Sequence, residues 1–357
     1  MKKALPILAT AILLCTLILA SCNFDATIGI YSEVSQSMPS ANVTMERYLG
    51  DNGDGTYYYL ADDGVFSYTS GTSKALYKSD ASRRVVGAYL ESSTSIYILS
   101  EKNSDKTTSI THYSGSDLST ATDLGSGFKG ILDGFCWKTE TVDSKEVSTI
   151  YSIDGGALTE YTVGNLNCDS FKVEYALQTE SASDKYAFFC LKVRVGETES
   201  IRYYVLKKGT ATPLAKVDET SSTVFYCGFQ YIGNDSTFVL FKKNTATNVS
   251  SAWKITDGSI AEFVKSMDNA LRKATTANSS FFYNDDVIVA CTNYFEIIHA
   301  DGTKESKNKE YATNISTADI TNFKLKSGSS TVYIVGTVEN LLYSIDMSNP
   351  SATPVKL

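Results

Sequence analysis

The stretch KVEYALQTESASDKYAFFCLKVRVGETESIRYYVLKKGTATPLAKV, residues 172–217, contains four strand-like segments. Apolar, aromatic and β-branched residues dominate these segments, and short runs of Ser, Asp, Glu, Thr and Gly separate them. The segments are residues 172–178, 186–193, 201–206 and 212–217. Strands of this length joined by short polar turns are typical of an antiparallel meander. The stretch therefore predicts one four-stranded antiparallel sheet.

The same unit recurs from Val43 to Leu357. Its most apolar strand is found at residues 57–62, 95–102, 134–140, 186–193, 237–243, 287–292 and 332–337. A turn residue follows the next strand of each unit, at Gly71, Gly115, Gly155, Gly209, Gly258, Gly302 and Asn349. Seven units over about 315 residues have a period of about 45 residues, which is the length of a four-stranded propeller blade. We predict an all-β fold, a seven-bladed β-propeller of four-stranded antiparallel blades, with six or eight blades as alternatives.

Two segments do not follow this repeat. MDNALRKA, residues 267–274, predicts a helical insertion between the fifth and sixth blades. IGIYSEV, residues 28–34, is a strand-like segment in an otherwise polar tether, and it either stays in the tether or pairs with the edge of the last blade. The expected organisation is a signal peptide over residues 1–21, a tether over residues 22–42 and a propeller over residues 43–357.

The N-terminus predicts export and a lipid anchor. Lys2 and Lys3 precede an apolar run that ends at Leu-Ala-Ser-Cys, residues 19–22, as in a secretory signal peptide. This ending resembles the lipobox of bacterial lipoproteins, and the resemblance implies cleavage before Cys22 and acylation of that residue, for example with palmitate. Each buried CH₂ of an acyl chain contributes about 0.8 kcal/mol to membrane binding. The alternative is an ordinary signal peptide with an incidental cysteine.

The resemblance implies a location in the bacterial cell envelope. Asn23 follows the lipidated cysteine where an inner-membrane retention signal would favour Asp, so the outer membrane is slightly favoured. Without Lys2 and Lys3, the 32 Lys and Arg residues become 30 against 40 Asp and Glu, a net charge of −10. An acidic chain of this kind does not predict nucleic acid as a partner.

Cysteine and histidine usage predicts structural roles. Five cysteines follow the lipobox: Cys136, Cys168, Cys190, Cys227 and Cys291. Several lie in apolar strand-like runs, where cysteine behaves as a small hydrophobic residue; a disulfide such as Cys190–Cys227 is the alternative. The two histidines, His112 and His299, fall at equivalent positions of blades two and six, too far apart to act together. The sequence therefore predicts neither a zinc site nor a catalytic residue.

Acidic residues gather in one class of loop. The loops that join the first to the second strand of each blade lie on one face of a propeller. Their acidic residues are Asp51, Asp54, Glu91, Asp133, Glu180, Asp184, Asp235, Asp285 and Asp286. We expect an acidic ring around one mouth of the channel that attracts Ca²⁺ or a basic partner. The alternative is that Asp simply favours tight turns, as in DNGDG at residues 51–55.

The loops of the opposite face are longer and more varied. Residues 80–86, 140–147 and 244–251 form three of them, and the first includes Arg83 and Arg84. Binding residues are commonly found on irregular loops that a rigid scaffold holds in place. This face is therefore the expected docking surface for a protein partner.

A lipobox followed by a propeller is similar to the layout of bacterial propeller lipoproteins, including those of the outer-membrane protein assembly machinery. The tryptophan-containing docking motif of that group is not repeated here, because Trp137 and Trp253 lie in non-equivalent strands, and no binding residue is carried over. We expect a monomeric, non-enzymatic protein-binding or scaffolding lipoprotein without a cofactor. The alternatives are a receptor for a carbohydrate or another small ligand, and a metal-dependent propeller hydrolase or lactonase.

Overall fold

The computed structural model describes residues 45–61, 64–70, 72–161, 163–181, 183–218, 221–232, 237–247, 249–256, 259–264, 280–284, 286–290, 295–299, 303–307, 323–325, 330–336, 341–349 and 355–356. The chain divides into two units, Met1–Asn42 and Val43–Leu357. The predicted helical insertion at residues 267–274, the strand-like segment at residues 28–34 and the lipobox lie outside the described residues.

Within the described residues of the second unit, the strands form seven four-stranded sheets, and in each sheet the strands pair in chain order. Blade 1 contains β1 (Met45–Asp51), β2 (Thr56–Ala61), β3 (Gly64–Thr69) and β4 (Thr72–Lys78). Blade 2 contains β5 (Arg83–Ser92), β6 (Ser95–Lys102), β7 (Thr108–Ser114) and β8 (Thr120–Ser126). Blade 3 contains β9 (Phe128–Leu132), β10 (Phe135–Val142), β11 (Lys145–Asp154) and β12 (Ala157–Tyr161), and the 3₁₀ helix η1 (Val163–Leu166) follows it.

The other four blades repeat this plan. Blade 4 contains β13 (Ser170–Glu180), β14 (Lys185–Val195), β15 (Thr198–Lys207) and β16 (Ala215–Asp218). Blade 5 contains β17 (Val224–Tyr231), β18 (Thr237–Asn244), β19 (Val249–Thr256) and β20 (Ser259–Val264). Blade 6 contains β21 (Ser280–Tyr283), β22 (Asp286–Ala290), β23 (Phe295–Ile298) and β24 (Lys304–Lys307). Blade 7 contains β25 (Phe323–Leu325), β26 (Thr331–Gly336), β27 (Leu341–Asp346) and β28 (Val355–Lys356).

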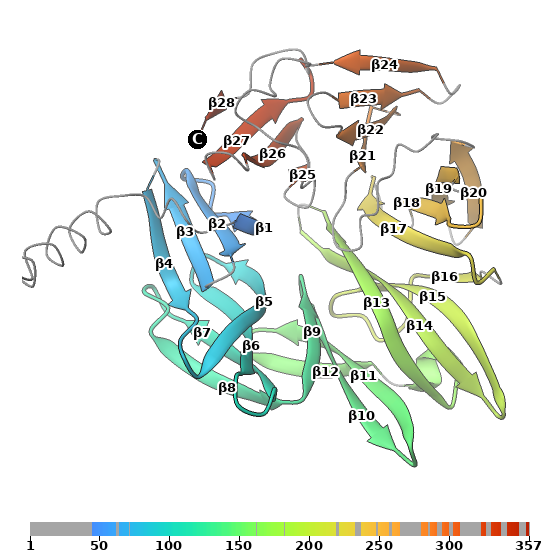
Figure 1. Ribbon diagram of the computed structural model, residues 1–357, viewed down its shortest axis with the longest axis horizontal. Coiled ribbons are helices and arrows are strands. Elements are labelled where there is room, and N and C mark those ends of the chain that lie inside the picture. The colour runs from blue at the N-terminus through green and yellow to red at the C-terminus, as the bar shows by residue number, and fades with distance from the viewer. Residues whose placement is uncertain are drawn as a thin grey trace, which may run out of the picture. The chain divides into compact units, whose positions relative to one another are not determined.

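The sheets of this unit follow one another around a ring (Figure 1). The last blade packs on the first, because the ring of Tyr333 in β26 lies 4.9 Å from that of Tyr48 in β1 and 5.4 Å from that of Tyr57 in β2. In a closed ring each sheet packs between two others, and this protects its strand edges. The prediction of an all-β propeller fold is confirmed, and the described residues contain one four-stranded sheet for each of the seven units in the sequence.

The core lies between neighbouring blades. Phe189 and Leu191 of β14 are fully buried against Phe135 and Ile150 of blade 3, whereas Phe188, on the other face of β14, packs toward blade 5. Because both faces of such a strand are covered, its sequence is continuously apolar rather than alternating. The apolar run that identified each second strand in the sequence therefore reports burial between two blades.

The described cysteines are buried thiols. Cys136, Cys168 and Cys190 are free, so the alternative of a Cys190–Cys227 disulfide is wrong. Burial raises the pKa of the Cys136 and Cys190 thiols to about 12, which leaves them protonated and unreactive at neutral pH. Among the described residues, we find no helix that is long and apolar enough to cross a membrane.

Candidate functional sites on the two faces of the propeller

The turns of each blade alternate between two faces, because successive strands run in opposite directions. Turns that join strands one and two, or three and four, lie on what we call the network face. Turns that join strands two and three, and the links between blades, lie on what we call the hairpin face. Hydrogen bonds confirm the division: Gly155, in a three-to-four turn, donates to Glu91, in a one-to-two turn, whereas Asn103, in a two-to-three turn, donates its amide to Ser82 O at 2.7 Å in a blade link.

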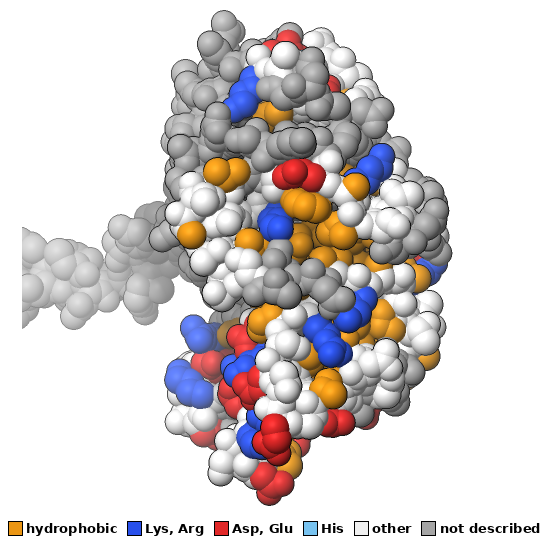
Figure 2. Space-filling model, turned by 90° about the vertical axis from the view of Figure 1, so that its right-hand side faces the viewer, with side chains coloured by type: hydrophobic (Ala, Val, Ile, Leu, Met, Phe, Trp, Pro, Cys, Tyr) orange, Lys and Arg blue, Asp and Glu red, His pale blue; other side chains and the backbone are white. Residues whose placement is uncertain are grey.

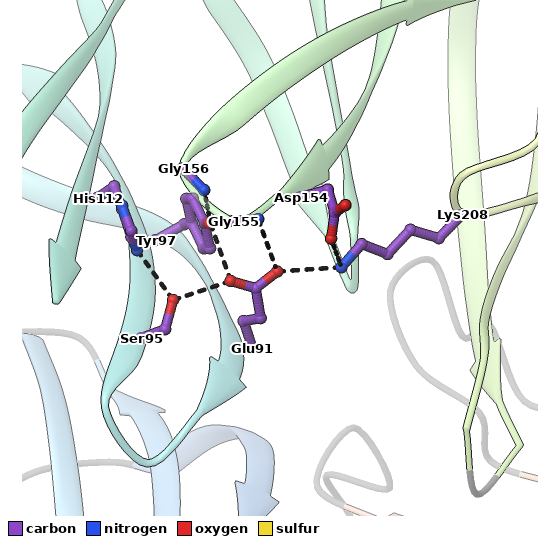
Figure 3. A network of polar contacts seen from close by, with 8 residues as sticks. All are labelled: Glu91, Ser95, Tyr97, His112, Asp154, Gly155, Gly156 and Lys208. Atoms are coloured by element: carbon purple, nitrogen blue, oxygen red, sulfur yellow. Dashed lines mark hydrogen bonds and ion pairs between the residues drawn. The ribbon is translucent and has the colours of Figure 1, made fainter.

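Glu91, at the end of β5, is the centre of a polar network that joins three blades (Figure 3). Its Oε2 atom accepts hydrogen bonds from Ser95 Oγ at 2.9 Å and Tyr97 Oη at 3.0 Å, both within blade 2. Its Oε1 atom accepts from the Gly155 amide of blade 3 at 3.4 Å and from Lys208 Nζ of blade 4 at 3.0 Å. One carboxylate therefore joins blades 2, 3 and 4.

Lys208 reaches this carboxylate across the intervening blade. Its Nζ atom lies 3.0 Å from Glu91 Oε1 and 3.2 Å from Asp154 Oδ1, and 5.9 Å from the centre of the Tyr89 ring. Only 19% of the Glu91 and Lys208 side chains is exposed, so solvent screens this ion pair less than a surface pair. The Nζ atom of Lys208 thus contacts both blade 2 and blade 3, and Lys208 holds blade 4 against both.

Two glycines of blade 3 make room for side chains of its neighbours. A Cβ atom at Gly134 would lie 2.9 Å from Lys208 Cδ, and one at Gly156 would lie 3.1 Å from His112 Nδ1. Both glycines also have positive φ, +80° and +88° respectively, which side-chain-bearing residues adopt at a cost. Glycine at these turns is therefore required by the conformation of blade 3 and by the approach of blades 2 and 4.

His112 of β7 completes the network. Its Nε2 atom lies 2.8 Å from Ser95 Oγ, and its ring stacks on Tyr97 with the ring centres 4.3 Å apart. The Tyr97 hydroxyl in turn accepts a hydrogen bond from the Gly156 amide at 2.8 Å. We call the set of Glu91, Ser95, Tyr97, His112, Asp154, Gly155, Gly156 and Lys208 the interblade lock.

The charges of the lock are set by burial and by the partners. Burial raises the pKa of Glu91, but hydrogen bonds from Lys208 and Ser95 outweigh burial, and the net pKa is lowered. Burial lowers the pKa of His112, and the charge of Glu91 offsets this in part. Burial raises the pKa of Tyr97 to about 12. At neutral pH Glu91 is thus a carboxylate and His112 a neutral imidazole.

This geometry differs from a catalytic triad, although a serine, a histidine and a carboxylate are in contact. In a triad the serine hydroxyl donates to the histidine, and the carboxylate holds the other ring nitrogen. Here the Ser95 hydroxyl donates to the Glu91 carboxylate, so its proton points away from the imidazole. The arrangement fixes the positions of three blades and does not activate Ser95 as a nucleophile.

Other residues of the predicted acidic ring lie in turns of the network face. Asp51 and Asp54 accept amide hydrogen bonds from Gly53 and Thr56 at 3.0 Å, so their carboxylates shape the DNGDG turn. Asp286 lies 2.8 Å from Nδ1 of His299. Asp235 and Asp285 lie outside the described residues.

Three acidic residues of the ring converge in blades 2–4. Glu91, Asp133 and Glu180 are close enough to Tyr89 for their charges to add to burial in raising its pKa. Lysines accompany two of them, because Lys185 pairs with Glu180 and Lys208 with Glu91, while Lys207 lies 3.3 Å from Asp184. Among the described residues, no group of three or more His, Cys, Asp or Glu side chains could hold a metal ion. A cation or a basic partner at this ring stays a prediction.

Sequence reasoning missed the basic and hydroxyl members of the lock. Lys207 and Lys208 directly precede Gly209, the turn glycine of blade 4, which has a φ of +77°. Since three-to-four turns share a face with the acidic loops, this position is a signal that could have placed Lys208 near the acids. Ser95 and Tyr97 gave no such signal, because their roles depend on the strand register of blade 2.

The two arginines predicted for partner docking contact their own blade on the hairpin face. Arg83 Nη1 donates to Ser109 Oγ at 2.8 Å and to Ser100 Oγ at 3.3 Å. Arg84 Nε lies 3.1 Å from Glu101 Oε1, with 58% of the Arg84 side chain exposed. Arg83 therefore stabilises blade 2, and Arg84 is the more accessible of the two.

Exposed valines mark the hairpin face in three consecutive blades. Val142 ends β10, Val195 ends β14 and Val249 begins β19, so each lies beside the turn that joins strands two and three of its blade. Their exposed fractions are 50%, 45% and 38%. The hairpins of blades 3 and 4 extend to the lower right in Figure 1. On the side of the molecule shown in Figure 2, hydrophobic side chains are exposed among acidic and basic ones.

Comparisons with known proteins identify the fold but no family. No protein-family profile and no curated protein matches the chain. The extracellular domain of a two-component system from B. thetaiotaomicron is similar with a TM-score of 0.49 and 12% identity, over 86% of this chain and 38% of that one. Dipeptidyl peptidase 4 of Porphyromonas gingivalis gives 0.50 and 9%, over 91% and 55%. The chain thus spans about half or less of these two proteins.

A third solved structure has a similar length. It is KlAtg21 in complex with the coiled coil of AgAtg16, with a TM-score of 0.52 and 9% identity, over 88% of this chain and 98% of that one. At such low identity the likeness concerns the fold alone, since propellers serve many unrelated functions.

Proposed function

We propose that this protein is a non-enzymatic, protein-binding β-propeller lipoprotein of the bacterial cell envelope, with the hairpin face as its docking surface. The observation that carries the proposal is the exposed valine at the same hairpin end in blades 3, 4 and 5. Apolar side chains that recur at one face of a rigid scaffold favour association with a protein. The third solved structure adds an example of a similar fold in complex with a coiled coil.

The interblade lock gives the docking surface a stiff support. Glu91, Lys208 and Gly155 hold blades 2–4 together on the network face, opposite to the hairpins of the same blades. Hairpins on a rigid base lose little conformational entropy when a partner binds, which favours affinity. In this proposal the network face is structural and the hairpin face is the binding surface.

Site-specific photo-crosslinking in cells tests the docking surface. A photoreactive amino acid replaces Val142 or Val195, with Ser93 as the matched control, because Ser93 is exposed in a one-to-two turn of the network face. We expect crosslinks to one envelope protein from both valine positions and none from position 93. Equal crosslinking from all three positions, or none from the valines, would contradict the proposal.

The lipid anchor is tested separately. Cells grown with an alkyne-labelled fatty acid should label the wild-type protein, and Cys22→Ser should remove the label and release the protein from the membrane fraction. Cys136→Ser is the control, since Cys136 is a buried thiol and its replacement should leave labelling unchanged. A labelled Cys22→Ser protein would exclude Cys22 as the lipidated residue.

A receptor for a carbohydrate or another small ligand is the second candidate. Three tyrosine rings meet where the first and last blades join, with Tyr333 4.9 Å from Tyr48 and 5.4 Å from Tyr57. Aromatic rings beside polar groups are the usual surface for sugar binding, and Tyr57 is partly exposed. Binding to a glycan array that Tyr57→Ala abolishes would favour this candidate over protein docking.

A further inference from the structure

The interblade lock contains one of the two histidines of the chain. His112 is only 8% exposed and lies between the Ser95 hydroxyl, the Tyr97 ring and the Gly155–Gly156 turn of blade 3. His299, in blade 6, lies beside the Asp286 carboxylate instead. Histidine is the side chain that changes charge between about pH 5 and 8. Because the surroundings of His112 and His299 differ, protonation of the two residues should affect the structure differently.

The hydrogen bonds of the lock determine which nitrogen of His112 carries the proton. Ser95 Oγ donates its only proton to Glu91 Oε2 at 2.9 Å. The contact of 2.8 Å between Ser95 Oγ and His112 Nε2 therefore needs a proton on Nε2. A neutral imidazole has one N–H group, so Nδ1 is unprotonated.

Nδ1 faces the turn of blade 3. A Cβ atom at Gly156 would lie 3.1 Å from Nδ1 and 3.4 Å from Cε1, so the backbone of the turn is close to this edge of the ring. The Gly156 amide is directed to the Tyr97 hydroxyl at 2.8 Å. In the described part of the chain, His112 Nδ1 makes no hydrogen bond. A proton added there would meet the turn without an acceptor.

The charged groups around His112 oppose each other. Glu91 at the end of β5 attracts a positive charge on the ring, whereas Asp154, beside the turn of blade 3, is 78% exposed and pairs with Lys208. Lys208 of blade 4 repels a positive charge on the ring. On β8, Thr122 lies opposite His112, and Asp123 lies opposite Thr111, with Asp123 Oδ1 accepting from the Gly125 amide. Tyr97 of β6 is neutral at these pH values.

The balance favours the neutral imidazole. Burial lowers the pKa of His112 below its ordinary value of 6.5, and Glu91 only partly restores it. A histidine with a lowered pKa in the folded protein contributes stability above the pKa of the unfolded chain. This contribution is lost as the pH falls from about 6.5 through the lower pKa of the folded state.

We propose that the interblade lock is an acid-sensitive conformational switch in which protonation of His112 opens the Gly155–Gly156 turn. The added N–H group on Nδ1 and its charge displace the turn. The hydrogen bonds from Gly155 to Glu91 and from Gly156 to Tyr97 are then lost, and blade 3 is released from blade 2 on the network face. The Glu91–Lys208 ion pair persists, because Glu91 with its lowered pKa remains ionised at this stage. This switch is independent of what binds the hairpin face.

Hydrogen exchange measured by mass spectrometry tests the switch on the full-length protein. The peptide that covers residues 150–161 is compared at pH 7.5 and pH 5.5, after correction for the intrinsic exchange rate. In the wild type we expect the protection of this peptide to be lost in part at pH 5.5 relative to pH 7.5. His112→Gln keeps a neutral donor near Ser95 and should remove the acid response.

His299→Gln is the matched control, because it removes the only other histidine. It should respond to acid in the same way as the wild type. Equal acid responses in the wild type and His112→Gln, or a response that His299→Gln abolishes, would overturn the proposal.

A direct titration covers the case in which His112→Gln fails to fold. ¹⁵N and ¹³C NMR of the wild-type protein reports the tautomer and the pKa of both imidazoles. We expect His112 with the proton on Nε2 at pH 7.5, and we expect the Gly156 amide signal to shift with the same midpoint as His112. A proton on Nδ1 at pH 7.5, or a Gly156 signal that does not follow His112, would also overturn the proposal.

Discussion

The network face and the hairpin face are formed by alternate turns of the same sheets, but their side chains are arranged differently. On the network face, the turns of blades 2–4 direct charged groups toward one another, and Lys208 contacts a carboxylate two blades away. On the hairpin face, Asp169 in a blade link accepts from the Gly196 amide at 2.7 Å, and a more exposed ion pair, Lys172 Nζ with Glu146 Oε2 at 2.8 Å, joins blades 4 and 3. The valines beside these turns stay exposed. The partly buried network that joins three blades thus lies on one face, whereas valines of three consecutive blades are exposed on the other.

Removal of the Glu91 carboxylate should produce the largest difference between the two faces. Glu91→Ala leaves Lys208, Ser95 and Tyr97 without their shared acceptor in a site where only 19% of the Lys208 side chain is exposed. We expect a loss of about 2–3 kcal/mol in the free energy of unfolding, below the cost of breaking a fully buried pair. Urea denaturation, monitored by tryptophan fluorescence, measures this loss in the free energy of unfolding.

Glu197→Ala is the control for this prediction. Glu197 is exposed in the hairpin turn of blade 4, and its removal should change the free energy of unfolding by less than about 0.5 kcal/mol. If the two variants lose the same stability, the network face does not hold the blades more firmly than the hairpin face.

A methyl group at the turn of blade 3 should have the next largest effect. Gly156→Ala places a Cβ atom 3.1 Å from His112 Nδ1 at a residue with φ of +88°. Gly196→Ala places one in open space at a φ of +58°. We expect a loss of about 1–2 kcal/mol for the first variant and about 1 kcal/mol for the second, which has only the backbone cost. The same denaturation experiment distinguishes them, and a larger loss for Gly196→Ala would contradict the close packing of His112 on the turn.

The sequence predicted the sheets well because burial between blades has a one-dimensional signature. A strand covered on both faces is continuously apolar, and this run at residues 95–102 coincides with β6. Turn glycines were recognised for a similar local reason, since Gly115, Gly155 and Gly209 all have positive φ.

The lock was not predictable in the same way. Lys208 meets Glu91 across 117 positions of sequence, and the contact depends on the angle between blades and on the length of each turn. The predicted loop positions grouped Glu91 with other acidic residues but gave no lysine partner for it. Arg83 was predicted for docking from its place near a loop, and the sequence did not indicate its hydrogen bonds to Ser100 and Ser109 of its own blade.

The contact between Lys208 and Glu91 should contribute a coupling free energy of about 1 kcal/mol to the stability of the fold. A double-mutant cycle with Glu91→Gln and Lys208→Met measures this coupling apart from the loss of each side chain. We expect the coupling to decrease when the salt concentration rises from 0.1 M to 1 M, because the pair is partly exposed. Two variants that act additively would show that Lys208 does not connect blade 4 to blade 2.

Substitution of the hairpin valines should have the smallest effect on stability and a large effect on binding. Val142→Ser and Val195→Ser remove methyl groups that are 50% and 45% exposed, so the folded protein loses little burial. We expect a change within about 0.5 kcal/mol in the free energy of unfolding for each variant. If the hairpin face binds a protein, the double variant should lose the partner crosslinked from neighbouring positions. The control Ser93→Ala, on the network face, should retain it. A stable double variant with unchanged crosslinking would mean that the exposed valines have no part in recognition, and binding would then have to be sought at the tyrosines between the first and last blades.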